Sequence, residues 1–335
     1  GTAISGRFYH TMVAIGKDIY IFGGRDASND YLSDFYKINT TNGAVTQITL
    51  SSSGTTIDVR YQHKMVAIGT DIYIYGGYNS GGYLVEFYKI DTLADSVIKI
   101  DPDGDSINSV YKHSMVAIGK DIYIFGGSDS SGLVNDFYKI DTTNNTATQI
   151  TLSSSGTTIT GRYEHSMVAI GKDIYIYGGY NSSGPLNDFY KIDTTNNTAT
   201  QITLSSSGTT ITGRYEHSMV AIGTDIYIFG GLNSSGPVND FYKIDITNNT
   251  VTLITLSSSG TTISGRYSHT MVAIGTDIYI YGGYSSGVLN DFYKIDTNTI
   301  NLSTNSVNVE VLTHNFTGDP NAARMEHTMV AIGTD

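Results

Sequence analysis

The chain contains no cysteine and no tryptophan among its 335 residues, and only 4 prolines. Without cysteine, disulfide bonds, thiolate catalysis and thiolate metal sites are excluded. Positive charge is also scarce, because 19 Lys and Arg stand against 31 Asp and Glu, for a net charge of −12. An acidic surface repels phosphate groups, so we expect no nucleic-acid partner. No apolar run reaches the roughly 18–20 residues of a membrane span, so we expect no membrane insertion.

Tyrosine (26) and glycine (37) are abundant instead, and one phrase, H-x-M-V-A-I-G, recurs along the chain. Its histidines are His10, His63, His113, His165, His217, His269 and His327. They lie 50 to 58 residues apart. A repeat of about this length, with several strands in each copy, is typical of β-propeller blades.

Each repeat predicts four short antiparallel strands. In one copy these are residues 165–171, 173–179, 189–193 and 198–204, separated by Gly-Lys-Asp, a Gly- and Ser-rich loop and Thr-Thr-Asn-Asn. The first two strands are apolar on both sides, so both faces of the sheet need cover, which neighbouring blades provide. An open stack is the alternative, but its end copies usually carry polar caps. The end copies here resemble the middle ones, which favours a closed ring.

The sequence therefore predicts an all-β fold, a six-bladed β-propeller with four antiparallel strands per blade. We expect one domain over residues 1–335. Its blades span about 8–57, 58–108, 109–160, 161–212, 213–264 and 265–320, with an extra first strand at 325–335.

Three phrases carry a family resemblance: R-x-x-H, then D-I-Y-I-F/Y-G-G, then N-D-F-Y-K-I-D. Together they resemble the kelch repeat and cover nearly the whole chain. The kelch Trp of the fourth strand is absent, and Gln149, Gln201 and Leu253 stand near its place, so the resemblance points to the broad kelch-like group. It implies protein–protein interaction, with a minority of oxidases and sugar binders.

The strand directions place the two long loops of every repeat on one face, where binding is expected. Two positions there vary between repeats, one after the Gly pair and one before the His. The predicted partner- or glycan-binding residues are Tyr9, Arg25, Tyr78, Tyr180, Tyr284, Glu164 and Glu216. The alternative is neutral variation on a solvated rim.

An Arg precedes the His by three residues, except at Val110, and an acidic residue opens the third strand. We predict a structural Arg–carboxylate bridge in each blade, rather than an anion clamp. The aligned histidines are predicted to be packed, hydrogen-bonded residues of the inner strand, rather than ligands of Zn²⁺ or a pH switch.

D-P-D-G-D-S at 101–106 occurs once. Asp101, Asp103 and Asp105 have the one-three-five spacing of a calcium loop, but Ser106 and Lys112 break the rest of the pattern. A weak calcium site is one reading, a solvated acidic turn the other. No further cofactor is expected.

The first strand of the chain is duplicated near its end. His10, Met12, Val13 and Ile15 match His327, Met329, Val330 and Ile332. Three explanations of this duplication stay open: the chain continues beyond residue 335, a seventh blade begins, or one copy inserts into a neighbouring molecule. The last hypothesis predicts filaments, since head-to-tail strand donation need not close.

No asymmetric catalytic constellation stands out, so we predict no catalytic residues and no enzyme. The leading prediction is a structural or interaction propeller that self-assembles by exchange of a terminal strand, with itself, other surface proteins or glycans as partners. A multivalent glycan-binding propeller is the alternative, and an oxidase-like enzyme fits less well. Frequent N-x-S/T sequons favour an extracellular or cell-surface location.

Overall fold

The computed structural model describes residues 7–16, 18–26, 28, 30–39, 44–52, 54–154, 158–206, 210–257 and 263–311. The chain divides into two compact units. Unit 1 runs to Leu152 and includes Thr160–Tyr163, whereas unit 2 comprises Ser153–Ile159 and continues from Glu164. Strands dominate the described residues, where the helical structure is limited to the 3₁₀ turn η1, Thr297–Thr299.

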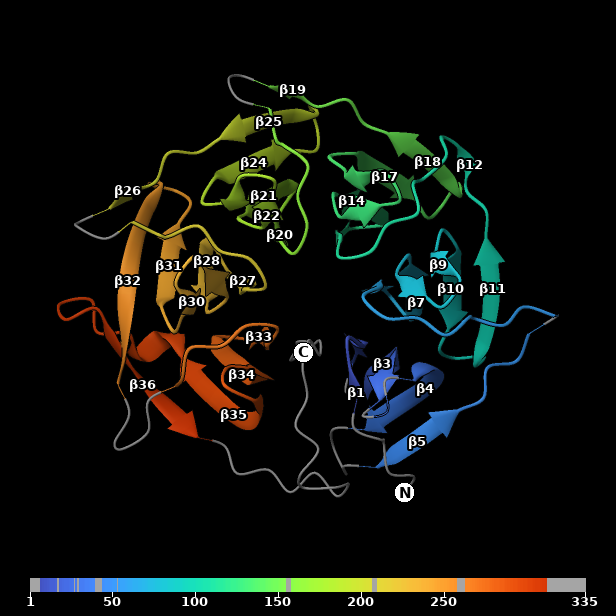
Figure 1. Ribbon diagram of the computed structural model, residues 1–335, viewed down its shortest axis with the longest axis horizontal. Helices are drawn as coiled ribbons and strands as arrows, with labels where there is room; N and C mark the ends of the chain where they lie inside the picture. The colour runs from blue at the N-terminus through green and yellow to red at the C-terminus, as the bar shows by residue number, and fades with distance from the viewer. Residues whose placement is uncertain are drawn as a thin grey trace. The chain divides into compact units, whose positions relative to one another are not determined.

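Unit 1 contains three groups of four antiparallel strands, called blades 1 to 3. Blade 1 has β2 (Thr11–Ile15), β3 (Asp18–Asp26), β4 (Tyr31–Asn39) and β5 (Val45–Ile48). Blade 2 has β6 (Lys64–Ile68), β7 (Asp71–Tyr75), β10 (Phe87–Asp91) and β11 (Ser96–Ile100). Blade 3 has β13 (Ser114–Ile118), β14 (Asp121–Phe125), β17 (Phe137–Asp141) and β18 (Thr146–Gln149). Strand order follows chain order in each blade, and β7, β10 and β11 lie side by side in Figure 1.

Unit 2 contains three more such groups, blades 4 to 6. Blade 4 has β20 (Ser166–Ile170), β21 (Asp173–Tyr177), β24 (Phe189–Asp193) and β25 (Thr198–Gln201). Blade 5 has β27 (Ser218–Ile222), β28 (Asp225–Phe229), β31 (Phe241–Asp245) and β32 (Thr250–Ser257). Blade 6 has β33 (Thr270–Ile274), β34 (Asp277–Tyr284), β35 (Val288–Asp296) and β36 (Ser306–Val311). The predicted all-β chain with four antiparallel strands per repeat is confirmed; the closed ring and the blade boundaries stay predictions.

The second strand of each blade is covered on both faces, as its sequence predicts. In β21 the side chains of Ile174, Tyr175, Ile176 and Tyr177 are all buried. Tyr175 and Tyr177 belong to a core cluster that also contains Met219, Ile226 and Ile228 of blade 5. Much of the core therefore lies between adjacent blades. Burial of each such side chain contributes about 1.5–3 kcal/mol to stability.

The outer edge of most blades is covered by the tail of the preceding blade. Short parallel strands β12 (Asp103–Gly104), β19 (Ser153–Ser154) and β26 (Ser205–Ser206) pair with β18, β25 and β32. The β32 strand extends this arrangement and pairs in parallel with β36. Covering the outermost strand protects an edge that would otherwise pair with other chains.

The segment predicted as a loop after the Gly pair is a small hairpin in the middle blades. The pairs are β8 (Tyr78–Asn79) with β9 (Gly82–Tyr83), β15 (Ser128–Asp129) with β16 (Gly132–Leu133), β22 (Tyr180–Asn181) with β23 (Gly184–Pro185), and β29 (Leu232–Asn233) with β30 (Gly236–Pro237). The left-handed backbone of the second Gly, such as Gly179 with φ 96°, redirects the chain into this hairpin. In blade 1 the same segment lengthens β3 and β4, and β1 (Arg7–Phe8) pairs with β3.

Candidate functional site

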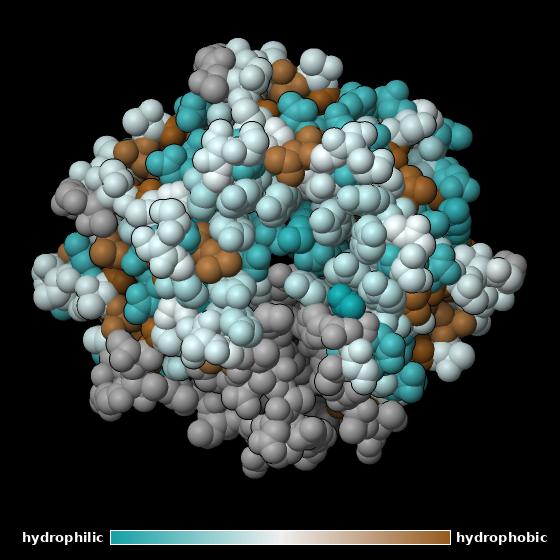
Figure 2. Space-filling model, in the orientation of Figure 1, coloured by the Kyte–Doolittle hydropathy of each residue, from teal (hydrophilic) through white to brown (hydrophobic). Residues whose placement is uncertain are grey.

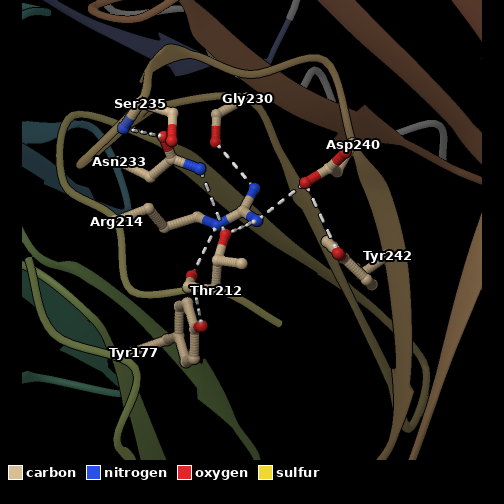
Figure 3. A network of polar contacts seen from close by, with 8 residues as sticks. All are labelled: Tyr177, Thr212, Arg214, Gly230, Asn233, Ser235, Asp240 and Tyr242. Carbon is tan, nitrogen blue, oxygen red and sulfur yellow. Dashed lines mark hydrogen bonds and ion pairs between the residues drawn. The ribbon is translucent and has the colours of Figure 1, made fainter. Parts of the chain in front are cut away.

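A buried arginine joins the start of each of several blades to its own Gly pair. Arg60, Arg162, Arg214 and Arg266 have no exposed side-chain surface. In blade 5, shown in Figure 3, Arg214 Nη1 donates to Gly230 O at 3.0 Å. Nη2 donates to Asp240 Oδ2 at 3.0 Å and to Thr212 Oγ1 at 3.0 Å, and Cζ lies 5.2 Å from the centroid of the Tyr242 ring. A buried charge needs such partners, so the predicted structural bridge is confirmed in this blade.

Blade 2 makes the same bridge less tightly. Arg60 Nη1 donates to Gly76 O at 2.9 Å, but Nη2 lies 3.7 Å from Glu86 Oε2, beyond hydrogen-bond distance. Burial lowers the pKa of Arg60, while Tyr88 and Glu86 oppose this shift. Glu replaces the Asp of the other blades here, and its longer side chain gives an ion pair without a hydrogen bond.

Four of the described histidines lie buried at junctions between blades of the same unit: His63, His113, His217 and His269. A Cβ placed on Gly76 of blade 2 would lie 2.9 Å from His113 Cε1 of blade 3, so this glycine makes room for the imidazole. The His113 ring meets the Tyr75 ring edge-on, with centroids 5.7 Å apart. The ring nitrogens of His63, His113 and His217 have no hydrogen-bond partner among the described residues. These histidines are therefore packed, as predicted, but His63, His113 and His217 lack the predicted hydrogen bonds to any described residue.

Burial holds these imidazoles neutral. It lowers the pKa of His113 to about 3, with a further contribution from Lys64. It also lowers the pKa of His63 and His217 well below the ordinary value, and the neighbouring Arg60 and Arg214 act in the same direction. Among the described residues, no group of three His, Asp or Glu side chains is placed to hold a metal ion.

On the long-loop side of unit 1, half-exposed tyrosines form one continuous cluster, the tyrosine patch. It comprises Tyr9, Tyr31, Tyr61, Tyr78, Tyr83 and Tyr111, whose successive ring centroids lie 5.1 to 5.9 Å apart. Two cations lie on its rings. Arg25 Cζ is 5.0 Å from the Tyr31 centroid and 5.2 Å from that of Tyr61, while Lys112 Nζ is 5.8 Å from that of Tyr111.

Sequence reasoning placed Tyr9, Arg25 and Tyr78 on this face and overlooked Tyr31, Tyr61, Tyr83 and Tyr111. A signal was available for two of them, because Tyr61 and Tyr111 directly follow the Arg or Val110 position in R-Y-x-H. Their backbones pair with the residues after the Gly pair, Tyr61 with Tyr78 and Tyr111 with Ser128. This pairing brings the two variable positions of a blade together.

The residue before each described histidine of the repeat has a left-handed backbone. These residues are Tyr9, Gln62, Lys112, Glu164, Glu216 and Ser268, with φ between 53° and 59°. Backbone hydrogen bonds link them from blade to blade within each unit. In unit 1, Gln62 N donates to Tyr9 O at 3.1 Å and Lys112 N to Gln62 O at 3.3 Å.

Unit 2 has the same backbone row with different side chains. Glu216 N donates to Glu164 O at 3.1 Å, and Ser268 N to Glu216 O at 3.0 Å. The Ser268 hydroxyl also donates to the Glu216 carboxylate. Tyr180 contacts Tyr215, and Tyr284 contacts Tyr267, with ring centroids 5.0 and 5.4 Å apart. The predicted residues of this unit thus lie in pairs, while those of unit 1 belong to a continuous patch.

The predicted strand-exchange residues are described only at the N-terminal copy. His10 and Val13 are buried, and Ile15 is half-buried. The β2 strand that holds them pairs with β3, from Thr11 opposite Phe22 to Ile15 opposite Asp18. The side chain of Met12, and the whole of His327, Met329, Val330 and Ile332, lie outside the described residues.

The predicted calcium residues belong to the tail that covers blade 3. Asp103 and Gly104 form β12, the carbonyl of Asp101 accepts from Asn145 Nδ2 at 3.2 Å, and the Asp105 carboxylate accepts from Gln149 N at 2.8 Å. This gives the segment a structural role at the sheet edge, and calcium binding stays a prediction.

On the face drawn in Figure 2, strongly hydrophobic residues appear as separate spots among polar ones. The large hydrophobic side chains exposed in the described part of the chain are Val85, Leu93, Ile98, Leu133 and Leu302. The helical content described above includes no segment long and apolar enough to cross a membrane. Tyrosines and charged groups, rather than an apolar patch, are therefore the recognition chemistry that this surface offers.

Comparison with known proteins gives a consistent family match. The model of the KLHDC2/KLHL20/DRC7 Kelch-repeats domain matches residues 9–158 and 112–335. The chain is 32% identical over 161 residues to Kelch domain-containing protein 3 of Homo sapiens, which covers 45% of this chain and 41% of that protein.

Two further relatives carry different names. The chain is 34% identical over 150 residues to the Rho GTPase-activating protein gacHH of Dictyostelium discoideum, covering 43% of this chain and 10% of that protein. It is 32% identical over 134 residues to N-(sulfonatooxy)prop-2-enimidothioate sulfolyase of Thlaspi arvense, covering 38% of this chain and 37% of that protein. The matched region thus spans less than half the length of each relative.

Proposed function

Because the chain belongs to the family of the KLHDC2/KLHL20/DRC7 Kelch-repeats domain, whose repeats act as protein-interaction scaffolds, we propose that it binds a protein partner through the long-loop side of unit 1. Kelch domains are generally non-catalytic, although one relative carries an enzyme name. We extend the non-catalytic role to this chain.

The observation that carries this proposal is the identity of the residues with positive φ. In the described part of the chain, most are Gly, and a second set is Asp95, Asn145, Asn197, Asn249 and Asn305 in the turns before the fourth strands. These residue types adopt a left-handed backbone at little cost. Only the row before the histidines uses other residues, at about 1–2 kcal/mol for each. Glycine would be cheaper, so the retained side chains indicate recognition.

The chemistry of the tyrosine patch indicates the kind of partner. Tyrosine and arginine are enriched at the energetic centres of protein interfaces. Arg25 and Lys112 place two positive charges on the patch, although the chain carries a net charge of −12. An acidic peptide segment would pair with these cations and pack against the rings.

Peptide selection on the immobilised protein tests this proposal. We expect enrichment of acidic sequences, and at least about fivefold weaker binding to the Lys112→Ala variant, for loss of a charge-assisted contact. Lys139→Ala is the matched control, since Lys139 belongs to the same blade but pairs with Asp121 at 2.8 Å on β14. Enrichment without acidic preference, or equal losses in both variants, would refute the assignment.

The glycan alternative has less support from the ring geometry. Tyr78 contacts Tyr61, Tyr83 and Tyr111, with interplanar angles of 69°, 85° and 48°. Neighbouring rings thus surround it and limit the flat face that a sugar would stack on. A glycan array with wild type and Tyr78→Ala separates the two: binding that depends on Tyr78 favours the glycan alternative.

Self-assembly by strand exchange is a second candidate, favoured by one observation. The place of the first strand in blade 1 is filled by β2 from the N-terminal copy, and in this candidate function the matching sequence at 327–333 is the strand that inserts into another molecule. Deleting residues 321–335 is then expected to abolish large assemblies in light scattering. Assemblies of unchanged size would rule the idea out.

A further inference from the structure

Blade 3 differs from the blades around it at the buried arginine, where Val110 stands. The complete arrangement is seen in blade 5. There the guanidinium of Arg214 donates to the carbonyl of Gly230, to the carboxylate of Asp240 and to the carbonyl and hydroxyl oxygens of Thr212, and it lies against the ring of Tyr242.

Blade 3 retains the counterparts of three of these partners, Gly126, Asp136 and Tyr138, whereas Asn108 replaces Thr212. The three counterparts line one small cavity of about 10 Å³, which is enough to hold a single water molecule. The other lining residues are Ile107, Asn108, Val110, Ile124 and Val134. The shorter Val110 side chain thus leaves room for one water molecule among the counterparts of the groups that bind the guanidinium in blade 5, and a guanidinium needs in addition the space that the Asn108 amide occupies.

The polar counterparts in blade 3 are incompletely matched within the described chain. The carbonyl of buried Gly126 accepts no hydrogen bond from a described residue. The carboxylate of Asp136 binds only neutral amides: Asn108 Nδ2 donates at 2.5 Å and Gln149 Nε2 at 2.8 Å. No described cation forms an ion pair with it. The site therefore combines an unsatisfied acceptor with an uncompensated, half-buried negative charge.

Tyr138 reports the same imbalance. Burial raises its pKa, and the charge of Asp136 raises it further. In blade 5 the pKa of Tyr242 is raised in the same way, but Arg214 opposes the shift. In the described chain no cation plays this part beside Tyr138, whose pKa is lowered only by a hydrogen bond with the Asn108 backbone.

We propose that this part of blade 3 binds one guanidinium group, supplied by an arginine side chain of a partner protein. The group donates to Gly126 O and Asp136, and its face lies against the Tyr138 ring. Asn108 and Asp136 are partly exposed, so the group enters from the long-loop side as the Asn108 amide turns away from Asp136. Charge-assisted hydrogen bonds replace the amide contact.

Titration with ethylguanidinium, followed by NMR of the full chain, tests the site. We expect saturable binding, with ethylurea, the neutral analogue of the same shape, binding at least about tenfold more weakly because it lacks the charge. Val110→Arg should remove the binding by supplying the group from within the chain. Asp136→Asn should weaken it similarly, and it decides the matter if Val110→Arg does not fold.

Absence of saturable binding, equal binding of ethylurea, or unchanged binding in the folded variants would overturn the assignment. The inference rests on the proposed function only in taking a protein as the source of the arginine. A protein that binds ethylguanidinium but no acidic peptide would contradict the proposed function and leave the guanidinium site unaffected. Ethylguanidinium that occupies the site should in turn weaken the binding of a partner protein that inserts an arginine there.

Discussion

At the scale of single residues, Arg214 shows how a charge with no exposed surface is tolerated. Its donors reach a carbonyl, a hydroxyl and a carboxylate, and its plane lies near an aromatic ring. Removing one partner of such an arrangement leaves the other acceptors without donors. The main energetic effect of losing the bridge is therefore the cost of leaving these buried acceptors without hydrogen-bond donors.

Arg214→Leu is accordingly expected to lower the free energy of unfolding by about 3 kcal/mol, measured by urea denaturation. The control is Arg25→Leu, since Arg25 is half-exposed on tyrosine rings and its loss should cost no more than about 1 kcal/mol. Similar losses for both variants would contradict the role given to burial.

We expect that building the arginine arrangement of blade 5 into blade 3 stabilises the chain, whereas Arg214→Leu destabilises it. Asn108 stands where blade 5 has Thr212, and its amide reaches Asp136 directly. The double change Asn108→Thr with Val110→Arg should raise the melting temperature in calorimetry. Val110→Arg alone should raise it less, because the Asn108 amide still competes for Asp136. A lower melting temperature for the double variant than for the single one would argue against this coupling.

Interactions between residue types that recur in every repeat were predictable from the sequence, whereas unusual backbone conformations were not. The Arg–carboxylate bridge follows from two opposite charges repeated at fixed positions. The left-handed backbone of Tyr9 or Lys112 gives no such signal, because neither residue favours it. Blade-to-blade hydrogen bonds impose it instead, and these depend on the assembled sheets.

At the scale of elements, the histidines make the junctions between blades sensitive to acid. The folded pKa of His113 is about 3, below that of an unfolded histidine. The unfolded chain therefore binds more protons between about pH 6.5 and pH 3, and stability falls as pH falls through this window. For His113 alone the loss is roughly 3 kcal/mol between pH 6.5 and pH 4.

His113→Leu tests this share. Neither ring nitrogen of His113 has a hydrogen-bond partner in the described chain, so leucine removes none. The slope of unfolding free energy against pH, averaged from pH 5 to 6.5, should fall by about 1.1 kcal/mol per pH unit. An unchanged slope would show that His113 is not neutral in the folded state.

The tail on the outer edge of blade 3 depends on Gly104. Its φ is 103°, and a Cβ would lie 2.4 Å from Ala147 O. Gly104→Ala should therefore destabilise the chain by more than about 1 kcal/mol in thermal unfolding. Gly287→Ala, where a Cβ meets nothing within 4 Å, should change little. Stabilisation by Gly104→Ala would mean that the tail is not held there.

Long strands were predictable and short ones were not. Alternating Ile and aromatic residues identify β21 from the sequence alone. The hairpin of β22 and β23 has the composition of a loop, and it was missed for that reason. Such short pairs gain little from their own sequence, since the backbone of the R-Y segment supports them, as in the pairing of Tyr215 with Leu232.

At the scale of the whole molecule, the predicted closed ring has a direct test. Residues 165–216 form one complete repeat, so deleting them preserves the sequence at every junction. In an open row the shortened chain would stay folded, with stability reduced in proportion. In a closed ring of six, we expect it to lose its monomeric fold, which size-exclusion chromatography and circular dichroism would detect. A stable, folded monomer would refute closure.

The backbone row before the histidines has a consequence for engineering. Main-chain hydrogen bonds fix its geometry, as between Gln62 N and Tyr9 O. The repeats already place an aromatic ring, an amide, an ammonium group, two carboxylates and a hydroxyl on this one backbone conformation. Libraries randomised at these codons should consequently retain a common scaffold while changing their targets, much as antibody loops do.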